Sequence, residues 1–453
     1  MGRITLRQAA AWCGGKVAPQ YENLSFCGAS NDSRSIAPGQ LFIALEGVRD
    51  GHDFIPMAME KGAAAVLCSR CVGDYPAILV EDPRKALGDI ARGERQRIGM
   101  KVVGVTGSVG KSTTKEMIAA VLESTYRVGK TPVNHNNDIG MPMAILSMPE
   151  DTQVAVLEMG MNHFREIAYL SQIAKPDVGV IVNIGTMHIE HLGSRAGILK
   201  AKLEILEGMA ADGSLFLNGD DEYLRSVKDR LKLKPIYFGT GLDATLRALD
   251  VRQEEDQLSF TVEGNAGERF PVTLPLEGMH YVTDAMASIG VGLKMGISPE
   301  RIALQLAKFQ NMDGRQQILH IGSYTLINDC YNAGPESMAA ALAVLGNRPG
   351  RHIAVLGDML ELGQRADEEH YRIGRIAAEK AQRVLVYGPH AVCVYQGALD
   401  AGMQCSDIGI YEDKAAMAAA LKQLALPGDT ILFKGSRGMR MEQVLQQFLK
   451  EEA

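Results

Sequence analysis

The chain has 453 residues, of which 46% are hydrophobic and 22% are charged, so we expect a globular protein of two to three domains. Its formal net charge of −7 argues against a protein that binds nucleic acid through bulk electrostatics. No apolar run approaches the length of a membrane span, and the N-terminus has no apolar signal-peptide core, which predicts a cytoplasmic protein. Seven scattered cysteines then predict reduced thiols.

The first predicted block covers residues 1–98 and the second covers residues 99–312. Short apolar runs predict strands in the first block, with a helical stretch between the first two runs. The second block has longer apolar runs, typical of parallel strands that are covered on both faces, and alternating residues at 241–273 that predict a small antiparallel patch. The predicted strands are LFIAL (41–45), AAAVLC (63–68), PAILVE (76–81), KVVGVTG (101–107), QVAVLEMG (153–160) and DVGVIVNIG (177–185).

The third block, residues 313–453, again alternates apolar runs with helical stretches, which predicts a second doubly wound sheet. We therefore expect an α/β protein of three domains. The central domain would be a P-loop-type doubly wound sheet, the C-terminal domain would be Rossmann-like, and the N-terminal domain would be a smaller α/β unit. The strand runs of the third block are YTLINDCYNAG (324–334), HIAVLGDM (352–359), RVLVYG (383–388) and DTILFKGS (429–436).

The stretch GVTGSVGKSTTK (104–115) indicates a phosphate-binding loop. A strand, a glycine turn and a helix start would direct backbone N–H groups and the helix dipole at a phosphate. Lys111 would reach the β- and γ-phosphates, and Ser112 would offer its hydroxyl to Mg²⁺. The common pattern G-x-x-x-x-G-K-[ST] requires glycine where this chain has Val105. By itself, the loop indicates only a nucleotide phosphate.

Polar residues follow the next two strands and the helix after them. Glu158 ends VAVLE, where it could hold Mg²⁺ beside Ser112, and a solvated strand-end glutamate is an equal alternative. His188 follows a buried strand at its carboxyl end, which favours a functional role. Lys200 and Lys202 begin a helix, where a cation is electrostatically unfavourable. They are either solvated surface lysines, or one of them is not a cation.

Five motifs in order resemble the central domain of the Mur ligases. They are TGSVGKST (106–113), NHNNDIGMP (134–142), EMGMNHFREI (158–167), NIGTMHIEHLGS (183–194) and KAKLEI (200–205). The family loop is of the TGxxGK[ST] type, which accounts for Val105. Folylpolyglutamate synthetase is a relative with a similar central domain. Residues 32–54 resemble the N-terminal domain of the tripeptide- and pentapeptide-forming members, and residues 328–338, 355–363 and 434–442 resemble the pentapeptide-forming member.

The resemblance implies an ATP-dependent amide ligase of peptidoglycan precursor synthesis. Such an enzyme joins D-alanyl-D-alanine to UDP-N-acetylmuramoyl-tripeptide through an acyl phosphate, and a monomer suffices for this reaction. The alternative is a sister Mur ligase or a folylpolyglutamate synthetase-like ligase. A P-loop switch without ligase activity is a rival from another class, which would need Ser112 and Glu158 but not His188 or Lys202.

The resemblance also implies roles for individual residues. Ser112 and Glu158 would hold one Mg²⁺, and His188 with a carbamylated Lys202 would serve a second, so that Lys111, His188 and Lys202 form the catalytic set. Nucleotide contacts would come from Thr106, Gly107, Ser108, Val109, Gly110, Lys111, Ser112, Thr113, Asn137, His280, Asp284, Arg315 and Asp329. Substrate contacts would come from Asp32, Ser33 and Arg34 at the UDP-sugar end, and from Asn162, Asn332, Lys434 and Arg437.

Two segments depart from the family pattern. The family has asparagines in the segment that contacts adenine, where this chain has Tyr281 and Asp284. Asp284 could still accept a hydrogen bond from an adenine amino group. The family also has an asparagine where this chain has Gly334, which has no side chain to contribute. Neither change touches the predicted phosphate or metal residues.

Overall fold

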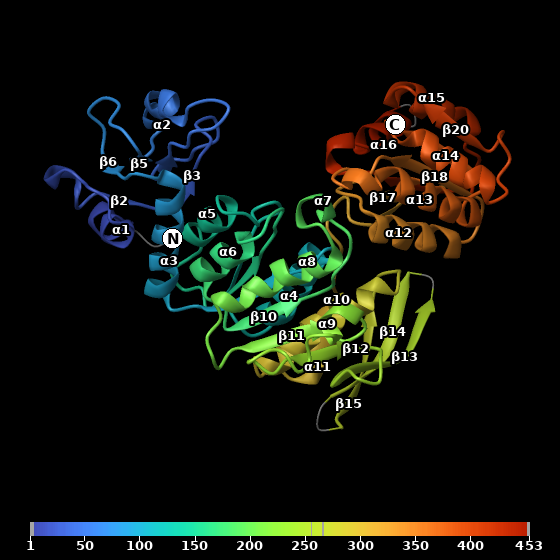
Figure 1. Cartoon of the computed structure of the whole chain (residues 1–453), viewed down its shortest axis with the longest axis horizontal. Helices are drawn as coiled ribbons and strands as arrows, with labels where there is room; N and C mark the ends of the chain where they lie inside the picture. The colour runs from blue at the N-terminus through green and yellow to red at the C-terminus, as the bar shows by residue number, and fades with distance from the viewer. Residues whose placement is uncertain (1–3, 255, 265–266, 451–453) are drawn as a thin grey trace.

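The N-terminal unit is built on a small parallel sheet. The computed structural model describes residues 4–254, 256–264 and 267–450, and it places this unit and the C-terminal unit on opposite sides of a central one (Figure 1). The sheet has the order β3-β4-β5-β6, and a two-stranded ladder, β1-β2, stands beside it. The elements are β1 (Ile4–Thr5), α1 (Leu6–Cys13), β2 (Ser25–Phe26), β3 (Ala29–Ser30), β4 (Leu41–Ile43), α2 (Ile55–Glu60), β5 (Ala65–Cys68), β6 (Ala77–Leu79) and α3 (Pro83–Ile98).

Helix α3 attaches the N-terminal unit to the central one. The Asp82 side chain caps the helix by accepting from the backbone N–H groups of Arg84 and Lys85, and Pro83 occupies the first helical position, where its missing N–H costs nothing. Leu87 and Ile90 of α3 belong to the same buried cluster as core residues of the central unit. Hydrophobic burial therefore fixes the position of the N-terminal unit.

The central unit has a nine-stranded sheet in the order β15-β14-β13-β12-β11-β10-β7-β9-β8. Strands β7 to β13 are parallel to their neighbours, and β13, β14 and β15 extend the same sheet as an antiparallel meander, in agreement with the alternating sequence pattern. The strands are β7 (Lys101–Thr106), β8 (Val128–Lys130), β9 (Val154–Glu158), β10 (Val178–Ile181), β11 (Ser214–Asn218), β12 (Ile236–Gly239), β13 (Leu246–Glu254), β14 (Gln257–Glu263) and β15 (Arg269–Leu274).

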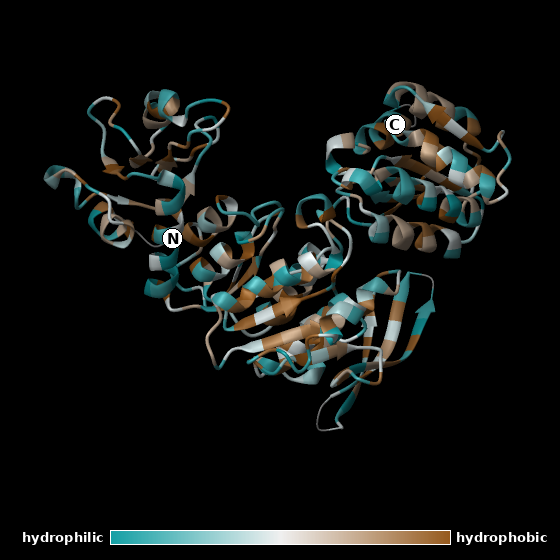
Figure 2. Ribbon diagram, viewed as in Figure 1, coloured by the Kyte–Doolittle hydropathy of each residue, from teal (hydrophilic) through white to brown (hydrophobic). Residues whose placement is uncertain are grey.

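Helices cover both faces of the central sheet, which is why its inner strands are uninterrupted apolar runs. Figure 2 shows hydrophobic residues concentrated on these strands and hydrophilic residues on the outer faces of the helices. No described helix is both long and apolar enough to cross a membrane. The helices are α4 (Lys111–Glu123), α5 (Gly140–Leu146), α6 (Glu166–Ala174), α7 (Ile189–Leu192), α8 (Arg195–Leu203), α9 (Glu222–Arg225), α10 (His280–Lys294) and α11 (Pro299–Leu306).

The C-terminal unit has a six-stranded sheet in the order β16-β17-β21-β18-β19-β20, parallel except for the β16–β17 hairpin. The three-unit α/β architecture predicted from the sequence is confirmed. The elements are β16 (Gln317–Ile321), β17 (Tyr324–Asp329), α12 (Pro335–Asn347), β18 (His352–Gly357), α13 (Ala366–Lys380), β19 (Arg383–Tyr387), α14 (Ala391–Asp400), β20 (Ile408–Tyr411), α15 (Lys414–Leu424), β21 (Thr430–Lys434) and α16 (Glu442–Leu449).

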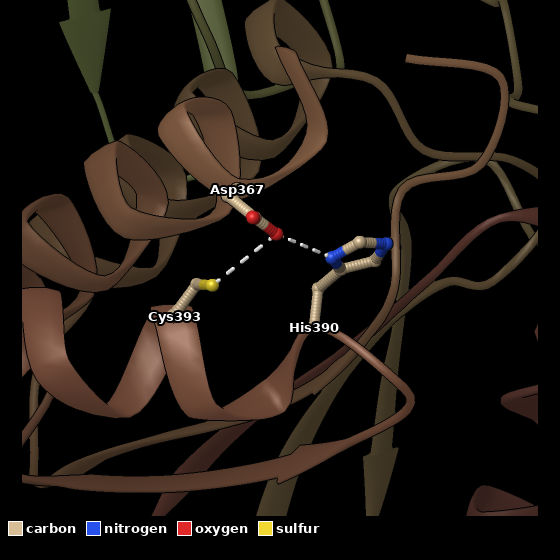
Figure 3. A group of neighbouring side chains, drawn as sticks. All are labelled: Asp367, His390 and Cys393. Carbon is tan, nitrogen blue, oxygen red and sulfur yellow. Dashed lines mark hydrogen bonds and ion pairs between the residues drawn. The ribbon is translucent and has the colours of Figure 1, made fainter. Parts of the chain in front are cut away.

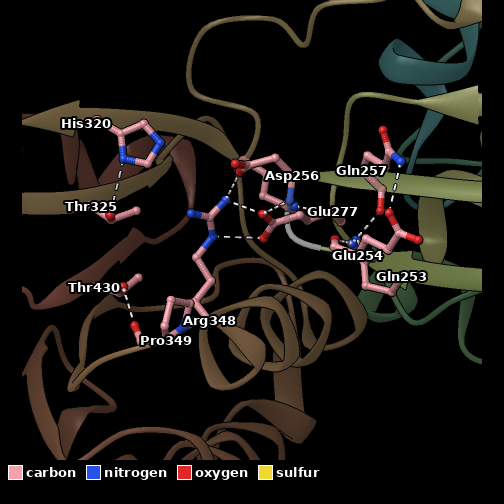
Figure 4. A network of polar contacts seen from close by, with 12 residues as sticks. Gln253, Glu254, Asp256, Gln257, Glu277, His320, Thr325, Arg348, Pro349 and Thr430 are labelled. Carbon is pink, nitrogen blue, oxygen red and sulfur yellow. Dashed lines mark hydrogen bonds and ion pairs between the residues drawn. The ribbon is translucent and has the colours of Figure 1, made fainter.

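A buried ion pair joins the central and C-terminal units (Figure 4). Arg348, at the end of α12, donates from Nε to Oε2 of Glu277 at 2.9 Å, and its Nη2 contacts the other oxygen of Glu277 and the carboxylate of Asp256. The side chains of Arg348 and Glu277 are only 3% and 7% exposed, whereas that of Asp256 is 61% exposed. Removing either partner therefore leaves the other charge buried.

We expect Arg348→Met to lower the free energy of unfolding by about 3–5 kcal/mol, the usual cost of an unpaired buried charge. Glu277→Met should cost less, because Arg348 keeps Asp256 as a partner. The double variant should recover part of the loss, and urea unfolding monitored by fluorescence and circular dichroism measures all three. Arg7→Met, which breaks the exposed Arg7–Glu22 pair, is the matched control. Equal stability of Arg348→Met and the wild type would contradict the role of this pair.

Candidate active site

A cavity of about 950 Å³ lies where the three units meet. It is bordered by the carboxyl ends of strands from both large sheets, where ligands bind in open α/β folds. Among the described residues of the N-terminal unit, only Asp82, Arg84 and Lys85 at the beginning of α3 line it. The sequence had not indicated these three residues, because α3 carries no recognisable ligand motif. The remaining lining residues belong to the central and C-terminal units.

The predicted phosphate loop connects β7 to α4 and lines the cavity. Gly110 has φ +84°, and a Cβ atom there would lie 2.7 Å from Oδ1 of Asp284, so only glycine fits. Lys111 folds back and donates from Nζ to the carbonyl oxygens of Gly107 at 2.9 Å and Ser108 at 3.1 Å. Burial lowers the pKa of Lys111, Glu158 opposes that shift, and Arg315 adds to it.

Asn183, just beyond β10, holds the phosphate loop in shape. Its Oδ1 accepts from the backbone N–H groups of Ser108 at 3.0 Å and Val109 at 2.9 Å. Its Nδ2 donates to the carbonyl oxygen of Val109 at 2.9 Å. Sequence reasoning assigned no role to this residue, although it opens the NIGTMHIEHLGS motif. The signal that could have found it is its position directly after a buried parallel strand.

Glu158 presents an oxygen that fits a metal ion. Its Oε1 accepts from Nδ2 of Asn136 at 2.9 Å, whereas its buried Oε2 has no hydrogen-bond partner among the described residues. A buried carboxylate oxygen without a donor is costly unless a cation is bound, and Mg²⁺ prefers such oxygen ligands. Ser112 also lines the cavity, and its hydroxyl accepts from Nη2 of Arg315 at 3.0 Å. These two residues therefore fit the predicted magnesium site.

His188 and Lys202 lie in different surroundings. His188 lines the cavity in a left-handed conformation with φ +62°, and its Nδ1 lies 2.8 Å from Oε2 of Glu361 in the C-terminal unit. Lys202 does not line the cavity and is 2% exposed. Burial lowers the pKa of Lys202 well below its usual value, and the charge of Lys111 adds to that effect. These surroundings favour the uncharged form of the Lys202 amine.

The C-terminal unit brings several predicted residues to the cavity. The guanidinium of Arg315 lies 3.9 Å from the ring centroid of Tyr331 and reaches Ser112 in the central unit. Lys434, at the end of β21, donates from Nζ to Oδ2 of Asp329 at 2.6 Å and to the carbonyl oxygen of Asn332 at 3.0 Å. The backbone N–H of Arg437 lies 3.4 Å from Oδ1 of Asn332.

A further contact between the units was not predicted. Oε1 of Glu336, in the first turn of α12, accepts from the backbone N–H of Thr186 at 2.9 Å and from its hydroxyl at 3.0 Å. Like the His188–Glu361 and Arg315–Ser112 contacts, it joins the central and C-terminal units beside the cavity. Partners 150 residues apart leave no local sequence signal.

The segment expected to contact adenine forms the start of α10. His280 lines the cavity, and burial lowers its pKa to about 4. Oδ1 of Asp284 accepts from the hydroxyl of Thr114 at 2.7 Å. Burial raises the pKa of Asp284 to about 7, and the hydrogen bond from Thr114 and the charge of Arg315 partly oppose this rise. A neutral Asp284 can both donate and accept a hydrogen bond.

Some predicted residues lie outside the cavity or are engaged elsewhere. Asp32 and Arg34 pair with each other on the N-terminal unit, and hydrogen bonds from Arg34 lower the pKa of Asp32 to about 2. Ser33 beside them is buried, with its hydroxyl 3.5 Å from the sulfur of Met57. Their proposed contact with a UDP-sugar stays a prediction. Thr106 and Gly107 precede the part of the loop that lines the cavity, which begins at Ser108.

Asn137, Asn162 and Thr113 line the cavity. The side chain of Asn137 is used to cap α5, because its Oδ1 accepts from the backbone N–H groups of Ile139 and Gly140. The backbone N–H of Asn162 donates to Oε2 of Glu166 at 2.6 Å. The structure thus places the predicted nucleotide, metal and dipeptide residues around one space, with the exceptions of Lys202, Thr106 and Gly107.

Comparisons with known proteins agree with this arrangement. Residues 26–95, 105–292 and 314–437 match the models described as Mur ligase family, catalytic domain; Mur ligase middle domain; and Mur ligase, glutamate ligase domain. The chain is 41% identical to the UDP-N-acetylmuramoyl-tripeptide–D-alanyl-D-alanine ligase of Bacillus subtilis, with 99% of each chain covered.

Two solved structures share the fold over nearly the whole chain. A crystal structure of MurF from Acinetobacter baumannii superposes with a TM-score of 0.92 at 30% identity and covers 100% of both chains. The MurF ligase of Thermotoga maritima, solved in complex with ADP, superposes with a TM-score of 0.84 at 31% identity and covers 94% of this chain and 97% of the other.

The raised pKa of Asp284 predicts a pH-dependent stability. Below about pH 4 this carboxyl is neutral in both the folded and the unfolded state, so it does not change the stability. As the pH rises from about 4 to about 7, the unfolded state loses the proton more readily than the folded state, and the stability falls. The full loss is at most about 4 kcal/mol for a shift of this size. Asp284→Asn removes the ionisation and should raise the melting temperature above that of the wild type at pH 8 and less at pH 5.

Differential scanning calorimetry at both pH values measures the effect. Asp212→Asn, at an exposed position, is the control and should follow the wild-type curve. A stability difference between Asp284→Asn and the wild type that does not grow with pH would refute the assignment of a buried, neutral carboxyl.

Proposed function

The chain belongs to the Mur ligase family, and from this premise we propose that it joins D-alanyl-D-alanine to UDP-N-acetylmuramoyl-tripeptide at the expense of ATP. The products would be ADP, phosphate and the UDP-N-acetylmuramoyl-pentapeptide used in peptidoglycan synthesis. The observation that carries the proposal is the single cavity lined by the phosphate loop, by Glu158 and by Arg315, Asp329 and Lys434. Such a cavity suits a reaction that brings a nucleotide and an acyl acceptor together.

The alternative ligases have less support. A sister Mur ligase or a folylpolyglutamate synthetase-like ligase would share the phosphate loop, so the loop cannot separate them. The similarity to the Bacillus subtilis ligase extends over 99% of the chain. It thus includes residues 32–54, which resemble tripeptide- and pentapeptide-forming enzymes, and residues 434–442, which resemble the pentapeptide-forming one. A P-loop switch would not need Lys202, and burial of a lysine costs free energy, so a role in ligation explains this residue better.

The first chemical step would activate the tripeptide. A carboxylate is a poor acyl donor, so its terminal oxygen would take the γ-phosphoryl group of ATP and form an acyl phosphate. The N–H groups at the start of α4 would bind the phosphates, and Lys111 would exchange the carbonyls of Gly107 and Ser108 for phosphate oxygens. Positioning and charge neutralisation, more than covalent enzyme chemistry, would drive this step.

Ser112 and Glu158 would hold one magnesium ion, and His188 with a carbamylated Lys202 would serve a second. Bound magnesium would supply neutralisation of phosphate charge during transfer. A carbamate forms when an uncharged amine attacks carbon dioxide and loses a proton, and burial favours that uncharged form of Lys202. The modification would replace a buried amine by an anion that suits a cationic site.

The second step would form the amide bond. The amino group of D-alanyl-D-alanine would attack the acyl carbon and release phosphate, with no enzyme nucleophile. Lys434 and Arg437 would lie near the incoming dipeptide, with Lys434 held by Asp329. Contacts between the units beside the cavity, such as Thr186 with Glu336, would help to exclude water from the acyl phosphate. Since one chain supplies every group named here, we propose a monomer, acting in the cytoplasm where ATP and UDP-sugars are made.

Substitution of Lys202 tests the carbamate. We expect Lys202→Ala to lower kcat by at least roughly a hundredfold, the scale seen when a charged group that stabilises a transition state is removed. Lys200→Ala is the matched control, because Lys200 lies two residues away on the exposed side of α8 and should leave kcat unchanged. Carbon-13 NMR of protein kept in labelled bicarbonate should show a carbamate signal that Lys202→Ala lacks. A signal that persists in this variant would place the modification elsewhere.

The activity itself is tested by phosphate release from ATP and Mg²⁺ in the presence of UDP-N-acetylmuramoyl-tripeptide. Release should require D-alanyl-D-alanine, and mass spectrometry should show a product heavier by one dipeptide less water. Tripeptides with diaminopimelate and with lysine at the third position are both tried. No reaction with either, followed by activity with a folate or another muropeptide acceptor, would replace this proposal with a sister ligase.

A further inference from the structure

A group of three different metal-ligand types lies in the C-terminal unit, outside the cavity. Oδ1 of Asp367, Nδ1 of His390 and Sγ of Cys393 all lie within 4.8 Å of one another. Figure 3 shows the carboxylate of Asp367 between the other two side chains. Its Oδ1 is 2.8 Å from Nδ1 of His390 and 3.5 Å from Sγ of Cys393. None of these residues takes part in the proposed reaction.

We propose that Asp367, His390 and Cys393 form a binding site for a divalent transition metal of the zinc type. Zinc takes thiolate, imidazole and carboxylate ligands at about 2.0–2.3 Å, so donors in a tetrahedral site lie roughly 3.3–3.7 Å apart. The carboxylate–thiol distance already has this value. The imidazole–carboxylate distance would have to open by roughly half an ångström. Water would occupy the fourth position, because the group faces solvent on one side.

Close helix packing fixes the positions of the three side chains. Asp367 lies in the first turn of α13, and His390 and Cys393 are three residues apart at the start of α14, which places them on the same side of that helix. The two helices touch through glycines. A Cβ at Gly374 would lie 2.0 Å from the carbonyl oxygen of Val394, and one at Gly397 would lie 2.0 Å from that of Tyr371. Helices this close keep the three donors near one another, and rotation of the side chains suffices to open the imidazole–carboxylate distance.

Neighbouring residues hold the imidazole of His390 in place. Its backbone N–H donates to Oδ2 of Asp358 at 3.1 Å, and its ring stacks on that of His370 with centroids 4.8 Å apart. His370 is buried and accepts at Nε2 from the backbone N–H of Met359 at 2.9 Å. Outer contacts that orient a ligating histidine are a regular feature of metal sites.

The charges of the group suit a divalent cation. Hydrogen bonds from His390 and Cys393 lower the pKa of Asp367, so this carboxylate is ionised, and it has no lysine or arginine partner among the described residues. Burial and the adjacent carboxylate raise the pKa of the Cys393 thiol. On binding, the thiol would lose its proton to solvent as the metal–sulfur bond forms. The bound thiolate and carboxylate would then balance the two charges of the metal.

A second group of neighbouring acidic and histidine side chains is less suited to a metal ion. Glu46, Asp50 and His52 in the N-terminal unit also lie within 4.8 Å of one another. There, Asp50 is already paired with Arg70, and His52 has both ring nitrogens engaged, by Asp50 and by the backbone N–H of Ser69. A cation already neutralises that group, and it has no sulfur ligand. The proposal therefore concerns only Asp367, His390 and Cys393.

Cobalt(II) titration of the full-length, metal-stripped protein tests the site. Cobalt bound to a thiolate gives a near-ultraviolet charge-transfer band, and the cavity contributes none because no cysteine is among its described lining residues. We expect the band in the wild type, its removal by zinc(II), and its absence in Cys393→Ser. Asp367→Asn and His390→Gln should weaken binding by at least roughly tenfold, the loss caused even by outer-shell changes.

Cys71→Ser is the matched control, because Cys71 is an exposed thiol three residues from Cys68 and far along the chain from this group. It should keep the band. Loss of the band in Cys71→Ser, with the band kept in Cys393→Ser, would assign the metal to Cys68 and Cys71 and overturn the proposal. Absence of the band in the wild type would also overturn it. Melting temperatures in EDTA should be equal for all variants. A zinc-dependent increase in the wild type that Cys393→Ser lacks would give a second, independent confirmation.

Discussion

The cavity depends on one buried ion pair, because the two large sheets are separate structures whose edges must face each other. Arg348 and Glu277 lie in water-poor surroundings, and their attraction has a direction as well as a strength, since the guanidinium fork meets both carboxylate oxygens. Apolar contact alone has no preferred direction, so it would allow the C-terminal unit to slide relative to the central unit. The ion pair instead fixes an orientation in which Arg315 reaches Ser112 and Glu336 reaches Thr186.

The same desolvation that makes this pair rigid also sets the chemistry of the lysines. Burial disfavours the charge of both Lys111 and Lys202, and the charge of Lys111 further disfavours that of Lys202. Lys111 has Glu158 nearby to support its charge, whereas Lys202 has no such neighbour in the described part of the chain. These surroundings agree with the proposed roles, in which Lys111 would bind phosphate and Lys202 would react as an amine. Two residues of the same type thus have different electrostatic surroundings.

Much of the fold could be predicted from the sequence because buried parallel strands have continuous apolar sequences. The run VAVLE became β9, with Glu158 at its carboxyl end as expected. Such reasoning finds residues at strand ends, which is why the phosphate loop, Glu158 and His188 were identified without a structure. Asn183 escaped notice only because an asparagine after a strand carries no distinctive chemistry.

Contacts between units could not be predicted in this way. Glu336, Glu361 and Arg348 act on partners more than seventy residues away, and nothing in their local sequence specifies the relative position of two sheets. The burial of Lys202 could not be predicted either, because the spacing of residues in KAKLEI fits an exposed helix as well as a buried one. The expectation that Lys202 begins a helix is wrong, because Lys202 lies in the last turn of α8, and the packing around this helix buries it.

The groups predicted to bind phosphate have hydrogen-bond partners within the protein. Lys111 donates to the carbonyls of its own loop, and Ser112 accepts from Arg315. In the proposed function a nucleotide would replace these hydrogen bonds, so its affinity would be the difference between two satisfied networks. A nucleoside without phosphates would offer Lys111 nothing in return for the loop carbonyls. Selectivity for the triphosphate would then arise partly from these carbonyls, which compete with every weaker ligand for the Lys111 ammonium.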